Sequence, residues 1–316
     1  MLNHGRAAFR AVDCDALTGP GMASRPCRLP VSAATGGVLP CCGDADRCCN
    51  DAVAAEPTVS PLLTGKDFAA VSEFDPANLL REGRRQRGLP AVPVPAVCLL
   101  DPDGDIVRHL QASGRGRAHP GWACYHTDMW TVDVGGLVIG VVGMAVGASF
   151  AVLVAEQLAA SGATLVLSIT SAGRIAQQLS TPCFVLIERA LRDEGTSYHY
   201  QLPAQWSHLH QGLQTALVGA FAGLGEPVLT GSSWTTDAPY RPTAAAITHA
   251  RGMGVACVEM EAAGLYAYAA ARGVAVVCFA HITNTMATNG NDFEKGPDAG
   301  VHDALALAAA AAHALT

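Results

Sequence analysis

Short apolar runs alternate with segments of helical character after residue 95, and this alternation constrains the fold more than any other feature. The runs lie at residues 96–100, 137–143, 164–170, 183–188 and 274–283. Each is apolar on both faces, which is typical of strands that helices cover on either side. Helices are predicted at 149–160, 209–224, 243–252, 262–272 and 301–314. The sequence therefore predicts an α/β fold, a three-layer αβα sandwich with a central mixed, mostly parallel sheet.

The first sixty residues differ from the rest of the chain. They are rich in Pro, Gly, Ala and Asp, lack a helical or strand period, and carry six of the 11 cysteines: Cys14, Cys27, Cys41, Cys42, Cys48 and Cys49. Zinc sites favour C-x2-C pairs in small folded knuckles, and no His pair lies nearby, so a flexible tail is favoured over a metal site. We expect a tail at 1–60, a linker with a short basic helix at 61–90, and one domain at 91–316.

Charge and hydropathy exclude several classes of function. The chain has 20 Lys and Arg against 27 Asp and Glu, a net charge of -7, which disfavours binding to nucleic acids and anionic membranes. The longest apolar candidate, 137–158, is interrupted by glycines and polar residues, so no transmembrane helix is expected. The first residues lack the apolar core of a secretory signal. We therefore expect a soluble, cytoplasmic protein with no nucleic-acid or membrane partner.

Candidate anion-binding residues follow the first two apolar runs, where open α/β sheets bind ligands. The segment Asp101-Pro-Asp-Gly-Asp-Ile-Val-Arg108 combines Gly104, which lets the backbone approach an oxyanion, with the forked donor of Arg108. It could equally form only a surface turn. The turn from Gly143 to Ser149 offers backbone N–H groups at a helix start. It carries neither G-x-G-x-x-G nor a P-loop lysine, so no dinucleotide or ATP is expected.

Three later segments place polar groups at similar positions. Ser168-Ile-Thr170-Ser171-Ala-Gly173 ends the third run with hydroxyls that could complete an anion site or only satisfy a turn. Glu259 and Glu261 flank Met260 between an apolar run and a helix, where an unneeded charge is costly; helix capping explains one carboxylate but hardly both. Asn284 follows the last run, and its amide could read a nucleobase edge or serve a turn.

Read in order, these segments resemble the nucleoside phosphorylase/nucleosidase superfamily, which includes uridine phosphorylase, bacterial purine nucleoside phosphorylase and the methylthioadenosine/S-adenosylhomocysteine nucleosidases. The similarity runs from about residue 90 to the C-terminus. GDIVR (104–108) resembles the family's G-D-P-x-R phosphate turn, GMAVGAS (143–149) its Gly-rich turn, SITSAG (168–173) its R-x-G-[ST]-x-G strand end, VEMEAAGLY (258–266) its V-E-M-E-A signature, and TTDAPYR (235–241) the segment that closes over the base. The resemblance implies a homo-oligomeric enzyme of nucleoside metabolism and salvage, with 91–316 as the catalytic domain.

The resemblance also assigns roles to residues. Gly104, Arg108 and Ser171 would bind phosphate. Met260 and Glu261 would hold the ribose, with Glu261 stabilising the cation that forms as the C–N bond breaks, and Glu259 would also bind substrate. Asn284 stands where purine-cleaving members carry a protonating Asp, which favours a pyrimidine or 6-oxopurine base over adenine. Tyr240 or Tyr200 would stack on the base. The implied catalytic residues are Glu261, Asn284 and Arg108.

Three hypotheses follow. The first is a nucleoside phosphorylase that uses inorganic phosphate as co-substrate, with no metal or organic cofactor, and releases free base and (deoxy)ribose 1-phosphate; Arg108 favours it. The second is a nucleosidase that uses water, which is favoured because Ser168 replaces a family Arg. Arg174, or Arg115 and Arg117 of a neighbouring subunit, could compensate for that loss.

The third hypothesis is an inactive nucleoside-binding protein, against which the costly burial of Glu261 argues. Pro239 replaces a Phe of the uridine enzymes, which leaves the base open.

Overall fold

A single large sheet organises the protein in the computed structural model, which describes residues 59–286 and 292–316. All five apolar runs form strands: β1 Val97–Asp101, β4 Leu137–Gly143, β5 Leu165–Arg174, β6 Cys183–Asp193 and β10 Ala275–Asn284. The described chain adds five more strands to this sheet: β2 Arg117–Ala118, β3 Trp130–Val134, β7 Trp206–His208, β8 Val228–Thr236 and β9 Val255–Glu259. The predicted α/β class is confirmed.

Strand β5 is the centre of the sheet. It pairs in parallel with β1 on one side and β10 on the other, and β1 pairs in parallel with β4. Strand β10 then pairs with β6, β6 with β8, and β8 with β9, which returns to the end of β5 at Gly173 and Arg174. These pairings close β5, β10, β6, β8 and β9 into a ring, while β1, β4, β3 and β2 extend the sheet outward.

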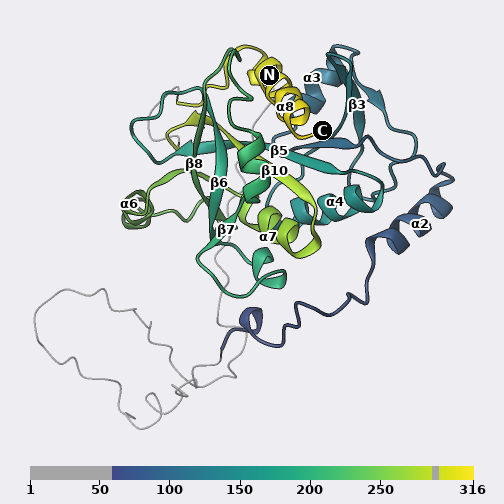
Figure 1. Ribbon diagram of the computed structural model, residues 1–316, viewed down its shortest axis with the longest axis horizontal. Helices are drawn as coiled ribbons and strands as arrows, with labels where there is room; N and C mark the ends of the chain where they lie inside the picture. The colour runs from purple at the N-terminus through teal and green to yellow at the C-terminus, as the bar shows by residue number, and fades with distance from the viewer. Residues whose placement is uncertain (1–58, 287–291) are drawn as a thin grey trace, which may run out of the picture. The chain divides into compact units, whose positions relative to one another are not determined.

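Helices cover both sides of the central strands. Their bounds are α2 Pro76–Arg87, α3 Asp105–Ala112, α4 Ala148–Ala160, α5 Gln211–Ala216, α6 Ala244–Gly252, α7 Ala262–Arg272 and α8 Val301–Leu315. Short 3-10 turns occur at η2 Pro61–Leu63, η3 Thr196–His199 and η4 Pro297–Gly300. Helices α3 and α8 lie on one side of β5 and β10, and α4 and α7 lie on the other (Figure 1). This is the three-layer arrangement that the apolar runs predicted.

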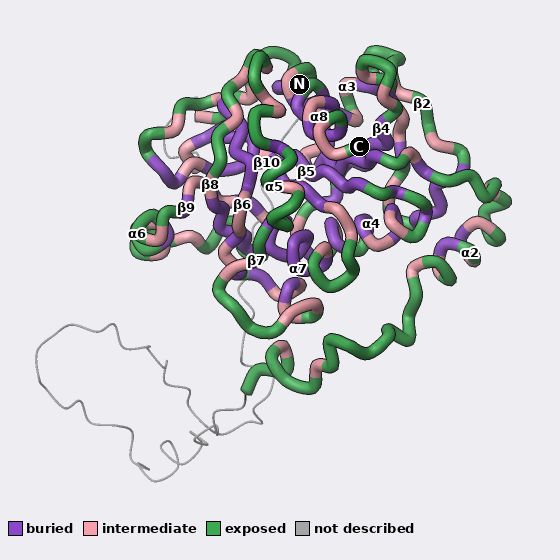
Figure 2. The backbone as a smooth tube through the Cα atoms, viewed as in Figure 1, coloured by how far each residue is buried: buried purple, intermediate pink, exposed green. Residues whose placement is uncertain are grey.

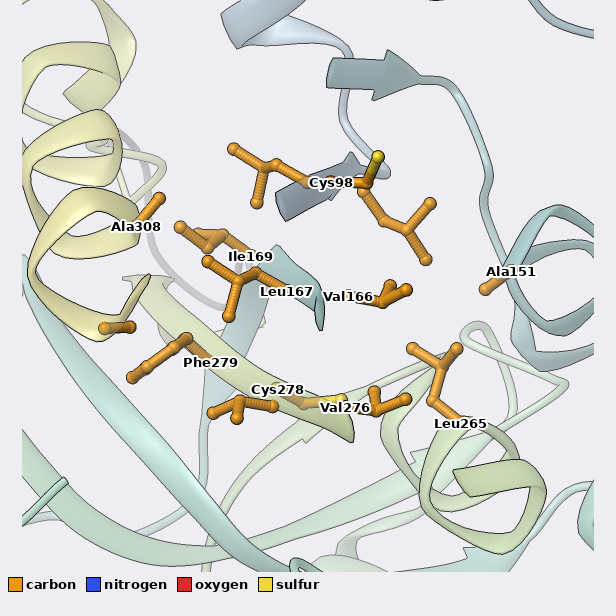
Figure 3. Close-up of a cluster of buried hydrophobic side chains, with 14 of the residues drawn as sticks. Cys98, Ala151, Val166, Leu167, Ile169, Leu265, Val276, Cys278, Phe279 and Ala308 are labelled. Carbon is orange, nitrogen blue, oxygen red and sulfur yellow. The ribbon is translucent and has the colours of Figure 1, made fainter. Parts of the chain in front are cut away.

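The core explains why the runs are apolar on both faces. Leu167 and Phe279 point toward Ala308 of α8, whereas Val166 and Val276 point toward α4 and α7 on the opposite side (Figure 3). All five of these residues are buried, and the central strands form the buried interior of the molecule (Figure 2). Side chains on both faces of β5 and β10 thereby lose contact with water, which is the main source of stabilisation for the domain.

Helices α4 and α7 approach each other closely at their N-terminal ends. A Cβ atom on Gly264 would lie 2.8 Å from the Cβ of Ala148, so a larger residue at either position would separate the helices. The two residues that precede these helices, Gly147 and Glu261, are consequently held near one another. This close packing positions two of the segments in which the sequence placed candidate site residues.

The helix predictions hold with two exceptions. The segment predicted as a helix at 209–224 is α-helical only over Gln211–Ala216, and Gly219 and Gly223 beyond it have φ values of 76° and 93°, outside the α region. The segment after Gly104, treated from sequence as a turn, continues as α3. The basic helix begins after Asp75 and ends at Gly88 with φ 65°, as predicted.

Residues 1–58 lie outside the described part of the chain, and so does the Cys-rich segment of the predicted tail. The boundaries at 60 and 90 remain predictions. Among the described helices, none combines the length and the apolar character that crossing a bilayer requires.

Candidate active site

Asp101, the last residue of β1, holds together the two turns that the sequence identified. Its Oδ1 accepts from the Gly104 N–H and its Oδ2 from the Val107 N–H, both at 3.0 Å, while its backbone carbonyl accepts from the Met144 N–H at 3.0 Å. Burial raises the pKa of this carboxyl to about 6. Sequence reasoning did not select Asp101, although a carboxylate that ends a fully apolar strand is the signal that could have identified it.

The turn at Gly104 has the shape expected of an anion-binding turn. Gly104 has φ 74° and precedes α3, and a Cβ there would lie 2.9 Å from Nη1 of Arg108. The Arg108 guanidinium is already engaged: Nη2 donates to the Asp103 carbonyl at 2.8 Å and to Oδ1 of Asp105 at 2.5 Å. The Arg108 side chain is half exposed and paired with an acidic neighbour.

Ser171, the third predicted phosphate ligand, lies beside this turn. Its backbone N–H donates to Oδ2 of Asp103 at 2.9 Å, and its hydroxyl donates to the same oxygen. Lys295 lies 3.2 Å from that oxygen and also forms an ion pair with Asp105. Sequence reasoning missed both Asp103 and Lys295. The rarity of lysine, found only at 66 and 295, is the one signal that could have drawn attention to the second.

Glu261 is the most buried of the predicted catalytic residues, with 1% of its surface exposed. Its Oε1 accepts from the Gly147 N–H at 2.7 Å, so the Gly-rich turn after β4 reaches this carboxylate directly. Burial, followed by the nearby charge of Glu259, raises the pKa of Glu261 to about 8; hydrogen bonds from Gly147, Thr170 and Met260 act in the opposite direction. The side chain is thus a buried acid poised to ionise near neutral pH.

Glu259 has a structural role at the start of α7. Its Oε2 accepts from the N–H groups of Glu261 and Ala262, both at 2.7 Å, and its Oε1 accepts from the hydroxyls of Ser233 and Thr235. A carboxylate offers about four lone-pair positions, and all are used. Glu259 therefore caps the N-terminus of α7 and fixes the backbone of Glu261. Substrate binding by Glu259 stays a prediction. Met260, between the two, is partly exposed.

Asn284 ends β10 opposite Gly173 of β5, at the same edge of the sheet as Ser171. Its Oδ1 accepts from the Met286 N–H at 2.7 Å, and its Nδ2 donates to the Thr283 hydroxyl at 3.1 Å. The amide plane is thus fixed, with 8% of the residue exposed.

The two candidate aromatic residues, Tyr240 and Tyr200, have different surroundings. Tyr240 is 98% exposed, and the structure does not bring it to the other site residues. The Tyr200 hydroxyl donates to Glu156 on α4 at 3.1 Å, and its ring packs edge-on against Tyr268. That one of them stacks on the base stays a prediction.

Glu261 and Arg108 are linked indirectly, through other residues of two segments. Nη1 of Arg108 lies 3.7 Å from the sulfur of Met144, which begins the turn whose Gly147 donates to Glu261. At the end of β5, Thr170 hydrogen-bonds to Glu261 while the next residue, Ser171, donates to Asp103. Two separate segments therefore connect the buried carboxylate to the anion-binding turn.

Ser168 stands where the family has an arginine, and Arg174 is the substitute proposed on this chain. Ser168 is 1% exposed inside the sheet, and its hydroxyl has no hydrogen-bond partner. Arg174 donates from Nη1 to the Leu179 carbonyl at 2.9 Å. Within residues 59–286 and 292–316, His, Cys, Asp and Glu side chains nowhere gather in threes in a way that could hold a metal ion.

The fold is that of the nucleoside phosphorylases and nucleosidases. Uridine phosphorylase from Vibrio fischeri ES114 is similar at 19% identity, with a TM-score of 0.58 over 70% of this chain and 92% of that one. AMP nucleosidase from Bacteroides thetaiotaomicron VPI-5482 is similar at 18% identity, with a TM-score of 0.57 over 70% of this chain and 90% of that one. No curated protein matches the chain.

The sequence model of the Phosphorylase superfamily matches residues 88–316, and the protein belongs to that family. The resemblance stated from the sequence motifs is therefore confirmed. The oligomeric state, the cellular compartment and the absence of a cofactor stay predictions.

Proposed function

We propose that the protein cleaves the N-glycosidic bond of a nucleoside and releases the free base. The observation that supports this most strongly is Glu261, a carboxylate held in a buried position by Gly147 beside the anion-binding turn. The sugar becomes cationic as the bond to the base breaks, and a preplaced carboxylate in a dry site stabilises that charge most effectively. Membership of the Phosphorylase superfamily supports the same chemistry.

Two nucleophiles are candidates for the reaction, and each is favoured by an observation. Inorganic phosphate is favoured by Arg108 at the Gly104 turn and by the additional cation Lys295 beside it. Water is favoured because Ser168, in place of an arginine, is buried in the sheet. In either case the C1′–N bond breaks with its electron pair going to the base, and a new C1′–O bond forms.

A nucleoside panel incubated with and without phosphate tests the proposal. Free base should be released from at least one pyrimidine or 6-oxopurine nucleoside. Chromatography with absorbance detection measures this release. The panel should include ribose and deoxyribose forms of each base. If no nucleoside loses its base under either condition, the proposed function is wrong, and a binding protein without catalysis becomes the better description.

Asn284 is proposed to set base preference, because an amide cannot transfer a proton to the leaving base. Asn284→Asp should therefore improve cleavage of adenosine-type substrates relative to wild type, by about tenfold if general acid catalysis is gained. The ratio of kcat/KM for adenosine to kcat/KM for the best oxo-base nucleoside measures the effect. An unchanged ratio in a folded variant would remove Asn284 from this role.

The pH dependence of cleavage follows from the raised pKa of Glu261. Only the ionised carboxylate stabilises a sugar cation, and the free enzyme holds the proton below a pKa of about 8. We expect kcat/KM to rise with pH by about tenfold per unit below this value and to level off above it. A profile from pH 5.5 to 9.5 measures this, and Glu261→Gln should lack the rising limb. A flat wild-type profile across neutral pH would contradict the assignment.

A further inference from the structure

The anion-binding turn already holds an anion, and that anion belongs to the chain itself. The Asp103 carboxylate receives the backbone N–H and the hydroxyl of Ser171, and Lys295 lies 3.2 Å from the same oxygen. A backbone N–H, a hydroxyl and an ammonium group are the donors by which proteins bind small oxyanions. Asp103 thus occupies Ser171, one of the three residues that the family resemblance assigned to phosphate, together with Lys295.

The cations near this position are also neutralised from within the chain. Arg108 pairs with Asp105, and Lys295 pairs with both Asp103 and Asp105. Asp101 adds a third carboxyl beneath the turn. Among the described residues, three acidic side chains therefore lie at this turn with two basic ones, and a phosphate dianion that entered would meet uncompensated negative charge, which disfavours its binding. Water carries no charge and meets no such barrier.

We infer that Asp103 is the residue that determines the nucleophile: its carboxylate takes the place of phosphate on Ser171 and Lys295, and so leaves water to attack the sugar. The inference rests on the proposed function and deepens it by choosing between its two nucleophiles. Asp103 is a specificity-determining residue and not part of the machinery that stabilises the sugar cation, which is the role of Glu261.

The two reactions differ in one bond and one product. In hydrolysis the water oxygen bonds to C1′, the C1′–N pair goes to the base, one water proton reaches the base nitrogen, and the other stays on the new sugar hydroxyl. In phosphorolysis a phosphate oxygen bonds to C1′, the phosphate proton reaches the base nitrogen, and the product is a sugar 1-phosphate. Free sugar and sugar 1-phosphate are separable, so the product identifies the nucleophile.

Replacement of Asp103 tests the inference. The wild type should release base at the same rate with and without phosphate, and should form free sugar. Asp103→Ala frees the Ser171 donors and Lys295, so base release should become phosphate-dependent by about tenfold or more, with sugar 1-phosphate seen by ³¹P NMR. Asp103→Asn removes the charge with little change of shape, and it replaces the alanine variant in the test if that variant fails to fold. Circular dichroism shows whether each variant is folded.

Two further variants make the test specific. Asp133→Ala removes another turn-capping carboxylate, which accepts from the Gly136 N–H at 2.9 Å in the exposed β3–β4 turn, and should behave as wild type. Lys295→Met added to Asp103→Ala should abolish the gained phosphate response, because one of the two remaining cations is lost. Survival of that response in the double variant would exclude Lys295 from phosphate binding and overturn the part of the inference that concerns it.

Direct phosphate binding, measured by calorimetry without nucleoside, separates this inference from the proposed function. Asp103→Ala or Asp103→Asn should bind inorganic phosphate about tenfold more tightly than wild type. Equal affinity in the folded variants overturns the inference whatever the activity. A wild type that already requires phosphate also overturns it while the proposed function stands. A wild type that releases no base refutes the proposed function, and the binding measurement still decides the role of Asp103.

Discussion

Glu261→Gln is expected to reduce kcat for nucleoside cleavage by about a hundredfold or more, the usual cost of removing one preorganised electrostatic group from a dry site. The amide keeps the shape and can still accept from the Gly147 N–H, so the fold should be preserved. Only the negative charge opposite the developing sugar cation is lost. Because that charge acts mainly in the transition state, kcat should fall and KM should change little.

Glu156→Gln is the matched control for this substitution. Glu156 is a partly buried carboxylate on α4 that accepts from Tyr200 and lies 3.7 Å from Arg272. Steady-state kinetics of the two variants on the best substrate of the panel provide the measurement. Activity of Glu261→Gln within a factor of about three of the control would show that Glu261 does not stabilise the reacting sugar.

Glu259→Ala is expected to lower the free energy of unfolding by about 3 to 5 kcal/mol, because it leaves buried hydrogen-bond donors without an acceptor. The carboxylate accepts from two backbone N–H groups at the start of α7 and from the hydroxyls of Ser233 and Thr235. The hydroxyls can turn to other acceptors, but the two N–H groups cannot. The loss should also displace Glu261, so activity should fall together with stability.

Urea unfolding followed by circular dichroism measures this change in stability. Glu73→Ala, which removes an exposed glutamate, is the control and should shift the free energy of unfolding by no more than about 0.5 kcal/mol. An unfolding midpoint of Glu259→Ala equal to that of the control would show that the α7 cap contributes little. It would also favour direct substrate binding as the role of Glu259.

The strands that could be predicted from the sequence are those whose own residues are apolar on both faces. Strands β8 and β9 escaped prediction for a physical reason. The end of β8 is rich in hydroxyl residues, and Ser233 and Thr235 are fully buried because Glu259 of β9 accepts their hydrogen bonds. Such burial depends on a partner from another strand, so the hydrophobic periodicity along one segment does not indicate it. The closed ring escaped prediction for the same reason.

The residues of the candidate site also differ in whether the sequence could predict them. Arg108, Ser171, Glu261 and Asn284 could be predicted because each lies near the carboxyl end of a strand, and the family motifs mark the same positions. Lys295 could not, since it reaches the turn from a segment 190 residues away from its partner Asp105. Asp103 could be read only as part of a turn. Its role emerges from the groups it contacts, and these come from β5 and from the segment before α8.

The ring of strands has a consequence for how the chain is made. Strand β5 needs β10 along one edge and β9 at its end, and both come from residues 255–284. While the ribosome is still translating the preceding part, the nascent chain carries β5 and β8 with open edges, and such edges are templates for association with other chains. Translation that stops before residue 255 would therefore leave a product prone to aggregation, even though most of the apolar core had already been synthesised.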